Sequence, residues 1–169
     1  QSKLASYSSY IADETFCNDR SILSGDGYKL DSMTYYGALD RLNNKKTPSL
    51  KCGGDNDKFR VSNASAKLDY PISLITADEV ALAGGVSGVT NMNYYLYNSR
   101  NFWTISPSYF NSSYSNAPVW YVMSSGGLNS WNSVANSYGV RPVINLRADA
   151  TITKGDGSSI NPFVIATKV

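Results

Sequence analysis

The feature that most restricts the fold is the segment 91–138, in which Arg100 is the single charged side chain. This segment holds 9 Asn, 11 Ser and 7 Tyr, together with all 3 Trp of the chain. Short aromatic and β-branched runs bounded by Ser, Asn and Gly are typical of strands. We therefore expect short strands joined by polar loops, with the strands at residues 94–97, 102–105 and 119–123.

The polar stretches between these strands, residues 111–116 and 124–133, are predicted as loops too polar to enter the core. Tyr contributes a large contact area at low entropic cost, and Ser and Asn contribute adaptable hydrogen bonds. This composition favours a binding surface. It is equally compatible with a secreted bacterial β-protein that uses these side chains only to fold.

Length and charge limit the class of protein. A chain of 169 residues with 42% hydrophobic residues can build one core, and without an internal repeat or linker we expect a single domain over residues 1–169. A net charge of +2 is too small to indicate nucleic-acid binding. No apolar run approaches the roughly 20 residues that span a bilayer, so we expect no membrane contact by this segment. The parent protein can still carry a membrane or wall anchor.

Histidine is absent from the sequence. Its absence removes Ser–His–Asp and Cys–His catalysis, as well as histidine metal sites. The aromatic segment also holds no Asp or Glu for the paired carboxylates that glycoside hydrolysis uses. We therefore expect a protein that is not an enzyme and that has no cofactor. Ca²⁺ at a loop containing Asp55 and Asp57 is the alternative, although Lys58 opposes it.

Cys17 and Cys52 are the only cysteines, and without His or a CxxC pair they lack the partners of a zinc site. A Cys17–Cys52 disulfide is the favoured interpretation, with two unrelated buried thiols as the alternative. In the chain-entropy estimate a loop of about 35 residues closed in this way stabilises by roughly 3–4 kcal/mol. Such a bond predicts an extracellular or cell-surface location.

The strongest local signal is a strand followed by a capped helix. Residues 71–75 are predicted as a strand, and Thr76 with Glu79 forms a capping box at the start of a helix that Gly84 ends. Further helices are expected over residues 1–12, continuing from an upstream part of a trimmed chain, and over residues 32–44 with Ser32 as the cap. Strands are expected at residues 140–146, 151–153 and 161–165, the last two joined by a hairpin turn at residues 155–157.

Arg141 lies in an otherwise apolar strand, where a buried guanidinium needs a carboxylate. Asp78 or Glu79, at the start of the capped helix, is the predicted partner, which makes these three residues structural. Binding of a ligand anion by Arg141 is the alternative.

Ligand contacts are expected from the aromatic segment. Trp103 and Trp120 lie in predicted strands and are interpreted as core, whereas Trp131 has polar neighbours and is expected to be exposed. The alternative is an aromatic platform for a sugar ring or an apolar peptide, formed by the three tryptophans with the tyrosines of the segment, among them Tyr94, Tyr121 and Tyr138. The candidate ligand-binding residues are Tyr95, Tyr97, Arg100, Tyr109, Tyr114, Trp131 and Asn132.

Taken together, these motifs resemble bacterial domains with the C-type-lectin-like fold, over residues 70–169 and more loosely before them. This superfamily includes formylglycine-generating (sulfatase-modifying) domains and receptor-binding proteins diversified by retroelements. The sequence is most similar to a branch on surface and phage-associated proteins of Gram-positive bacteria. The motifs are LITADEV at 74–80, FWTISP at 102–107, SGGL at 125–128, YGVRPVINL at 138–146, and GDG at 155–157 with NPFVI at 161–165.

The resemblance implies an α+β domain with a small twisted antiparallel sheet, flanking helices and long loops. It also implies that the region before the GVRP motif faces the ligand. The formylglycine-generating branch uses cysteines in the C-terminal part of the domain, and this chain has none after Cys52. That difference argues against its oxidase activity.

These observations support a non-catalytic, extracellular recognition or adhesion domain that binds a surface glycan or protein through its aromatic loops. The alternative is the globular head of a pilus-like or filament subunit that self-assembles through aromatic patches. An enzyme of another type is a third alternative, which no motif in the sequence supports.

Overall fold

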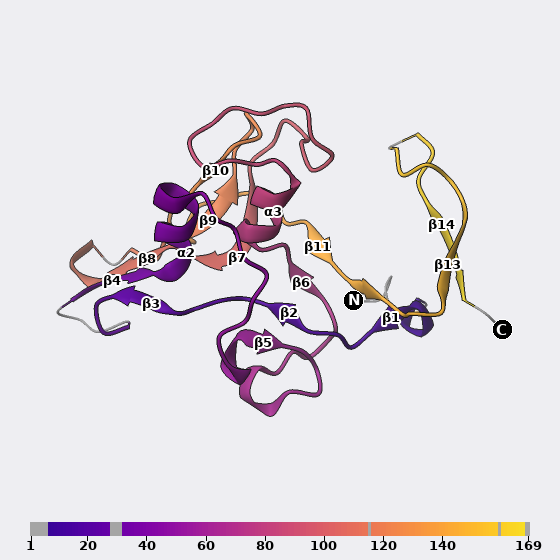
Figure 1. The fold of residues 1–169 in the computed structure, drawn as a ribbon, viewed down its shortest axis with the longest axis horizontal. Helices are drawn as coiled ribbons and strands as arrows, with labels where there is room; N and C mark the ends of the chain where they lie inside the picture. The colour runs from indigo at the N-terminus through magenta and orange to yellow at the C-terminus, as the bar shows by residue number, and fades with distance from the viewer. Residues whose placement is uncertain (1–6, 28–31, 115, 159, 168–169) are drawn as a thin grey trace.

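The computed structural model describes residues 7–27, 32–114, 116–158 and 160–167. Within them the protein is a mixed structure of small antiparallel sheets and two short α-helices, α2 (Gly37–Asp40) and α3 (Ala77–Ala83) (Figure 1). The prediction of an α+β fold is confirmed. No helix in the described part of the chain is both long enough and apolar enough to cross a membrane.

The central sheet is built on β7 (Phe102–Pro107). This strand pairs with β9 (Val119–Val122), which pairs in turn with β10 (Leu128–Asn129), in the order β10-β9-β7. The register aligns Phe102 with Val122 and Leu128 in one row, and Trp103 with Tyr121 and Asn129 in the next. Because successive side chains of a strand point to opposite faces, the two rows lie on opposite sides of the sheet.

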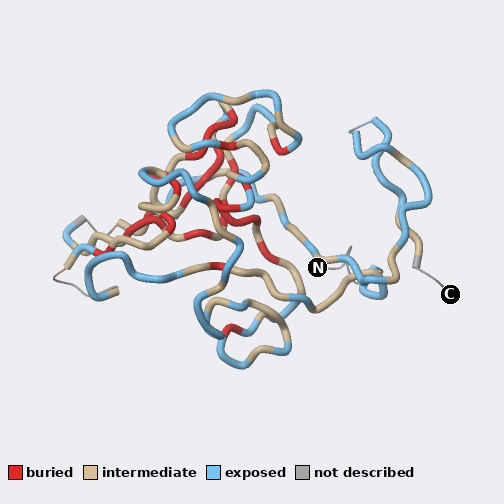
Figure 2. The backbone as a smooth tube through the Cα atoms, viewed as in Figure 1, coloured by how far each residue is buried: buried red, intermediate tan, exposed pale blue. Residues whose placement is uncertain are grey.

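The row of Phe102, Val122 and Leu128 is buried and forms part of the core. Trp120, which is fully buried, lies on the same side of β9, and Val80 of α3 and Leu42 belong to the same cluster. Figure 2 shows this buried region between α3, β7 and β9, while the C-terminal part of the chain is largely exposed. The prediction that Trp120 belongs to the core is confirmed.

Helix α3 begins as the sequence predicts. The Thr76 hydroxyl accepts a hydrogen bond from the Glu79 backbone N–H at 3.1 Å, and the Glu79 carboxylate accepts one from the Thr76 N–H at 2.8 Å. This reciprocal pair satisfies N–H groups that have no partner inside the helix. Gly84 ends the helix with φ of 123°, a backbone conformation that a side chain disfavours. The predicted capping box is confirmed.

The helix predicted over residues 32–44 is wrong in its first half. Residues Met33–Tyr36 form β4, which lies between β3 (Ile22–Ser24) and β8 (Tyr109–Asn111). Helix α2 starts only at Gly37 and continues as a π-helical turn over Arg41–Lys45, so Ser32 is not its cap. The Met-Thr-Tyr-Tyr sequence suits a strand, and pairing with distant β8 outweighs the helical spacing.

Three pairs of two-residue strands connect the rest of the fold. They are β1 (Ile11–Ala12) with β12 (Asn145–Leu146), β2 (Phe16–Cys17) with β5 (Lys58–Phe59), and β6 (Ser73–Leu74) with β11 (Pro142–Val143). Short 3-10 turns occur at Ser8–Tyr10, Asp55–Asp57, Ala64–Ala66 and Ser112–Tyr114. The helix predicted over residues 1–12 begins outside the described residues. From Ser8 onward it is replaced by a 3-10 turn and β1.

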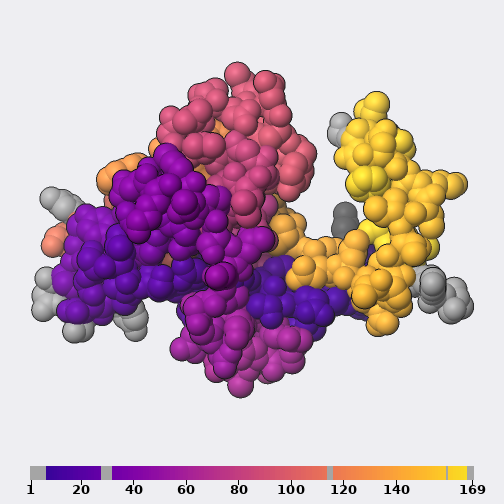
Figure 3. Space-filling model, in the orientation of Figure 1, coloured from indigo at the N-terminus to yellow at the C-terminus, as the bar shows by residue number. Residues whose placement is uncertain are grey.

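The C-terminal hairpin joins β13 (Ala150–Lys154) to β14 (Val164–Thr167) and projects away from the body as a separate lobe (Figures 1 and 3). Its predicted turn is confirmed, with φ of 90° at Gly155 and 83° at Gly157, and its second strand starts later than predicted. One strand prediction and one loop prediction are wrong. Residues 94–97 are a turn and not a strand, and residues 124–133 include β10, whose Leu128 is fully buried.

Candidate ligand-recognition site

The outward row of the central sheet carries an aromatic cluster, formed by Trp103, Tyr121 and Tyr138. The ring centroid of Tyr138 lies 4.6 Å from that of Trp103 and 4.9 Å from that of Tyr121. Trp103 and Tyr121, neighbours across β7 and β9, meet edge to face at 5.9 Å. Tilted and edge-to-face contacts at these distances are favourable for aromatic rings.

The backbone next to Tyr138 is fixed to the edge of β7. The Trp103 N–H donates to the Gly139 carbonyl at 3.0 Å, and the Gly139 N–H donates to the Asn101 carbonyl at 3.0 Å. The side-chain amide of Asn132 donates to the Tyr138 hydroxyl at 2.6 Å. The aromatic cluster is therefore held by the sheet and by a neighbouring loop.

The three rings differ in how much of them solvent reaches. Tyr121 is only 7% exposed, whereas Trp103 and Tyr138 are half-buried and open to solvent. Burial, followed by the proximity of Tyr138, raises the pKa of Tyr121 above its ordinary value. Trp103 therefore belongs to the solvent-facing side of the sheet, and its assignment to the core is wrong. On β7 the side chain of Phe102 points into the core, so that of its neighbour Trp103 points to the other face.

A pocket of about 470 Å³ adjoins the cluster, with Tyr138 in its wall. Its lining consists of residues 98–102, Ser124 and residues 137–141. Side-chain oxygens order the loop on one side. The side-chain oxygen of Asn98 accepts a hydrogen bond from the Arg100 N–H at 3.1 Å, and the side-chain oxygen of Asn101 accepts one from the Ser124 N–H at 2.7 Å. Between them Ser99 has φ of 56°, which is uncommon for a residue with a side chain.

Arg141 lines the same pocket and does not pair with Asp78 or Glu79. Its guanidinium carbon lies 4.7 Å from the ring centroid of Phe102, and one N–H group donates to the Leu96 carbonyl. The prediction of a carboxylate partner is wrong. Arg141 is only half-buried, so a ring face and a carbonyl are sufficient.

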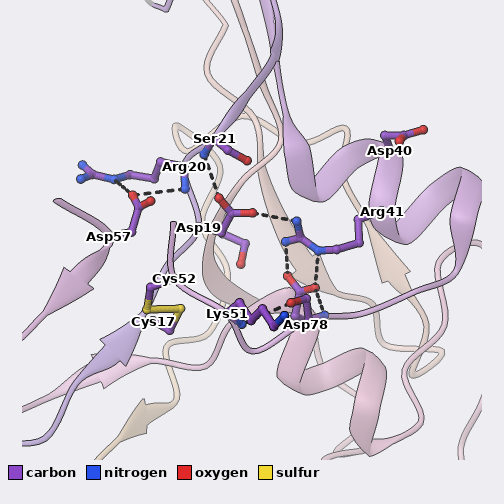
Figure 4. Close-up of polar contacts among 12 residues, drawn as sticks. Cys17, Asp19, Arg20, Ser21, Asp40, Arg41, Lys51, Cys52, Asp57 and Asp78 are labelled. Atoms are coloured by element: carbon purple, nitrogen blue, oxygen red, sulfur yellow. Dashed lines mark hydrogen bonds and ion pairs between the residues drawn. A yellow bond between two sulfur atoms is a disulfide. The ribbon is translucent and has the colours of Figure 1, made fainter. Parts of the chain in front are cut away.

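Arg41 takes the place that the sequence reading gave to Arg141 (Figure 4). Its Nε and one terminal nitrogen donate to the two carboxylate oxygens of Asp78 at 2.7 and 2.8 Å, and the other terminal nitrogen donates to Asp19 at 2.7 Å. The Ser49 N–H also donates to Asp78, at 2.8 Å. Two-pronged contacts of this kind are among the strongest hydrogen bonds in proteins.

Two groups of this network, Arg41 and Asp19, have shifted pKa values. The hydrogen bonds that Arg41 donates to Asp78 raise the pKa of Arg41 against the opposing effect of burial. Burial alone would raise the pKa of Asp19, but hydrogen bonds from Ser21 and Arg41 outweigh it and lower that pKa. A cavity of about 160 Å³ lies beside the network. Because Arg41 pairs with both Asp19 and Asp78, we interpret these three residues, the Arg41 ion-pair network, as structural.

The predicted Cys17–Cys52 disulfide is present beside the Arg41 ion-pair network (Figure 4). It ties β2 to the loop that contains Ser49. Arg41 and Asp19 were missed by sequence reasoning, because the choice between Arg41 and Arg141 depends on tertiary packing. The one usable signal was Asp78, a carboxylate that the capping box leaves without a partner.

The remaining predicted ligand contacts are dispersed. Arg100 lines the pocket and Asn132 contacts the cluster. Trp131 is 64% exposed, as predicted, and packs edge to face on buried Tyr109 at 5.7 Å. Tyr95 is 79% exposed. Tyr97 lies close to Gly126, and the side chain of Tyr114 falls outside the described part of the structure.

The carboxylates considered for Ca²⁺ have cationic partners. Asp55 pairs with Lys58 at 2.9 Å, and Asp57 pairs with Arg20 at 3.2 Å. Among the residues that the structure describes, no group of three His, Cys, Asp or Glu side chains is placed to hold a metal ion.

The fold and the site define an α+β domain with an aromatic sheet face and an arginine-lined pocket beside it. The chain belongs to the family described as Domain of unknown function (DUF6273), whose model matches residues 50–148. The matched segment contains α3, the central sheet, the aromatic cluster and the whole lining of the pocket. No curated protein matches the chain, and no solved structure matches it.

Proposed function

We propose that the protein is a non-catalytic recognition domain that binds a surface glycan or protein through the aromatic cluster and the adjoining pocket. The observation that carries the proposal is the placing of half-exposed Trp103 and Tyr138 on a sheet face, with buried Tyr121 behind them. Ordered aromatic rings offer contact area at low entropic cost. A rigid strand positions such rings more accurately than a free loop does.

The groups around the rings suit ligands with many hydroxyl or amide groups. Asn98, Asn101, Ser124 and Ser137 line the pocket, and each offers a neutral donor or acceptor. Rings of Tyr and Trp present apolar faces against which a sugar ring or a peptide side chain packs. The described residues that line the pocket include no carboxylate and no thiol, which supports binding without catalysis.

The location and the finer fold belong to the same proposal. The disulfide supports an extracellular or cell-surface location, because such bonds persist in oxidising compartments. We assign a C-type-lectin-like fold on the strength of the sequence motifs. Small antiparallel sheets with flanking helices and long connections support it.

The test is binding of the purified, oxidised domain to glycan and protein arrays. The informative variants are Trp103→Leu and Tyr138→Ala, and Tyr70→Ala is the matched control, since its ring is half exposed and lies outside the aromatic segment 91–138. We expect a specific ligand whose binding falls in both cluster variants and persists in the control, while cooperative thermal unfolding shows that all three variants remain folded. A ligand that binds all three variants equally would place recognition on another surface.

A second candidate function is that of a filament subunit head, and the C-terminal hairpin favours it. Ile152, Phe163 and Val164 of this lobe are each at least half exposed. An apolar hollow of about 380 Å³ lies between the hairpin and the β1–β12 pair. Large exposed apolar patches commonly mark interaction sites. Sedimentation at rising concentration tests this role: self-association that Ile152→Lys abolishes supports it, and a monomer at all concentrations contradicts it.

A further inference from the structure

The pocket beside Tyr138 has an unusual charge balance. Arg100 and Arg141 both line it, and none of its described lining residues carries a negative charge. Between Glu79 and Asp149 the sequence contains no Asp or Glu at all. The acidic groups of the network at Arg41 are engaged with that residue. The pocket is therefore a locally cationic site on a chain whose net charge is only +2.

Both guanidinium groups have capacity for a ligand. Arg141 is oriented by the Phe102 ring and by one hydrogen bond to the Leu96 carbonyl. A guanidinium has five N–H donors, so others remain for the pocket. Arg100 is exposed and makes no ion pair with any residue in the described ranges. Its backbone is set by Asn98, which holds the loop at the mouth of the pocket.

We infer that this pocket binds the carboxylate of an acidic sugar, with the sugar ring packed against Tyr138 and Trp103. The inference rests on the proposed recognition function and names its ligand class. Arg is the side chain that best matches a planar carboxylate, through paired hydrogen bonds. The volume of about 470 Å³ lies within the roughly 300–1,000 Å³ common for small-ligand pockets.

The position of the aromatic cluster favours an acidic sugar over a free anion. Tyr138 is shared by the pocket and the cluster, so one ligand can reach the arginines and the rings together. A saccharide unit with a carboxylate on its ring has an apolar face for the rings and an anion for the arginines. The neutral groups of Ser124 and Ser137 remain available for its hydroxyls.

The test uses an array of oligosaccharides that contain uronic or nonulosonic acids, each printed beside its methyl ester. Peptides with free C-termini are included. Because hydrogen bonds to charged groups are the stronger class, we expect an acidic saccharide to bind about tenfold or more tightly than its ester. Arg100→Gln should remove most of this difference. Arg147→Gln is the matched control, because Arg147 is exposed, pairs with Asp149 and lies outside the pocket.

The outcomes separate the inference from the proposed function. Equal binding of an acid and its ester, or binding of peptides alone, overturns the acidic-sugar inference and leaves recognition intact. An acid preference that Arg100→Gln leaves unchanged also overturns it. Binding to no glycan, ester, peptide or protein overturns both. Because Arg100 is exposed, its variant should keep the wild-type unfolding midpoint, which separates lost binding from lost folding.

Discussion

Replacing Arg41 with Met is the strongest test of how much the Arg41 ion-pair network contributes to the stability of the fold. The side chain of Arg41 is only 17% exposed, and those of its partners Asp78 and Asp19 are 6% and 14% exposed. Removing one partner of a buried ion pair leaves an uncompensated charge and costs about 3–5 kcal/mol. Asp19 keeps its backbone hydrogen bond from Ser21, so we expect a loss of about 3 kcal/mol, at the lower end of this range.

A loss of that size is a large part of the 5–15 kcal/mol of stability typical of a domain. The assay is urea unfolding of the oxidised protein, followed by tryptophan fluorescence, to which buried Trp120 contributes. Arg147→Met is the control, since its exposed pair with Asp149 should leave the midpoint unchanged.

The double variant Arg41→Met with Asp78→Asn sharpens the test. It should lose less stability than the sum of the two single changes, because the second change removes the stranded charge. A loss below about 1 kcal/mol for Arg41→Met would refute the reasoning, since that is the range of a surface pair.

Three further predictions follow from the titrating groups and the disulfide. The pKa of Asp19 is lowered in the folded protein, so its stabilisation is full above the ordinary value of about 3.9 and is lost as the pH falls below it. Urea midpoints measured across that range should drop, and less so in Arg41→Met. The pKa of Tyr121 is raised, so its stabilisation is present below pH of about 10 and is lost as the pH rises further. Absorbance titration of tyrosine should show late-ionising groups, one of which Tyr121→Phe removes. Reduction of Cys17–Cys52 should cost about 3–4 kcal/mol, measured as a drop in the unfolding free energy.

Each of these predictions has a contradicting result. If the urea midpoint falls equally at low pH in wild type and in Arg41→Met, Arg41 does not lower the pKa of Asp19. Loss of an ordinary tyrosine in Tyr121→Phe would mean that the cluster is open to water. An unchanged unfolding free energy after reduction would mean that the loop around Cys52 is held by other contacts.

Local signals in the sequence were sufficient for part of the fold. The capping box of Thr76 and Glu79 depends on residues three apart, so the sequence alone could predict it. The strands at β7 and β9 follow from short aromatic and β-branched runs, and the disulfide follows from the exclusion of other cysteine chemistry. Each of these features depends on neighbours in the chain or on composition.

The remaining features depend on distant partners. Residues Met33–Tyr36 have a spacing that fits a helix, but their register with Tyr109–Asn111 makes them a strand. Likewise Arg41 and Arg141 are equally plausible partners for Asp78 until the chain is folded. In the site, Trp103 is predicted as core because the sequence indicates the strand but does not indicate which of its alternating side chains face the core.

The predicted ligand contacts divide for the same reason. Arg100 lines the pocket and Asn132 binds the hydroxyl of Tyr138, which belongs to both the pocket and the cluster. Trp131 directly precedes Asn132 in the chain, yet its ring packs on Tyr109 and not on the aromatic cluster. Composition located the segment that carries the site, but it could not say which of its rings share a face.

The three tryptophans allow the most direct test of the central claim, because each occupies a different environment. Trp103 lies in the aromatic cluster, Trp120 lies in the core, and the exposed ring of Trp131 packs on buried Tyr109. The measurement is a titration of the ¹⁵N-labelled domain with its array ligand, monitored through the three indole N–H signals. Recognition at the aromatic cluster predicts that the Trp103 signal moves while those of Trp120 and Trp131 stay in place. Movement of the Trp131 signal alone would contradict the account.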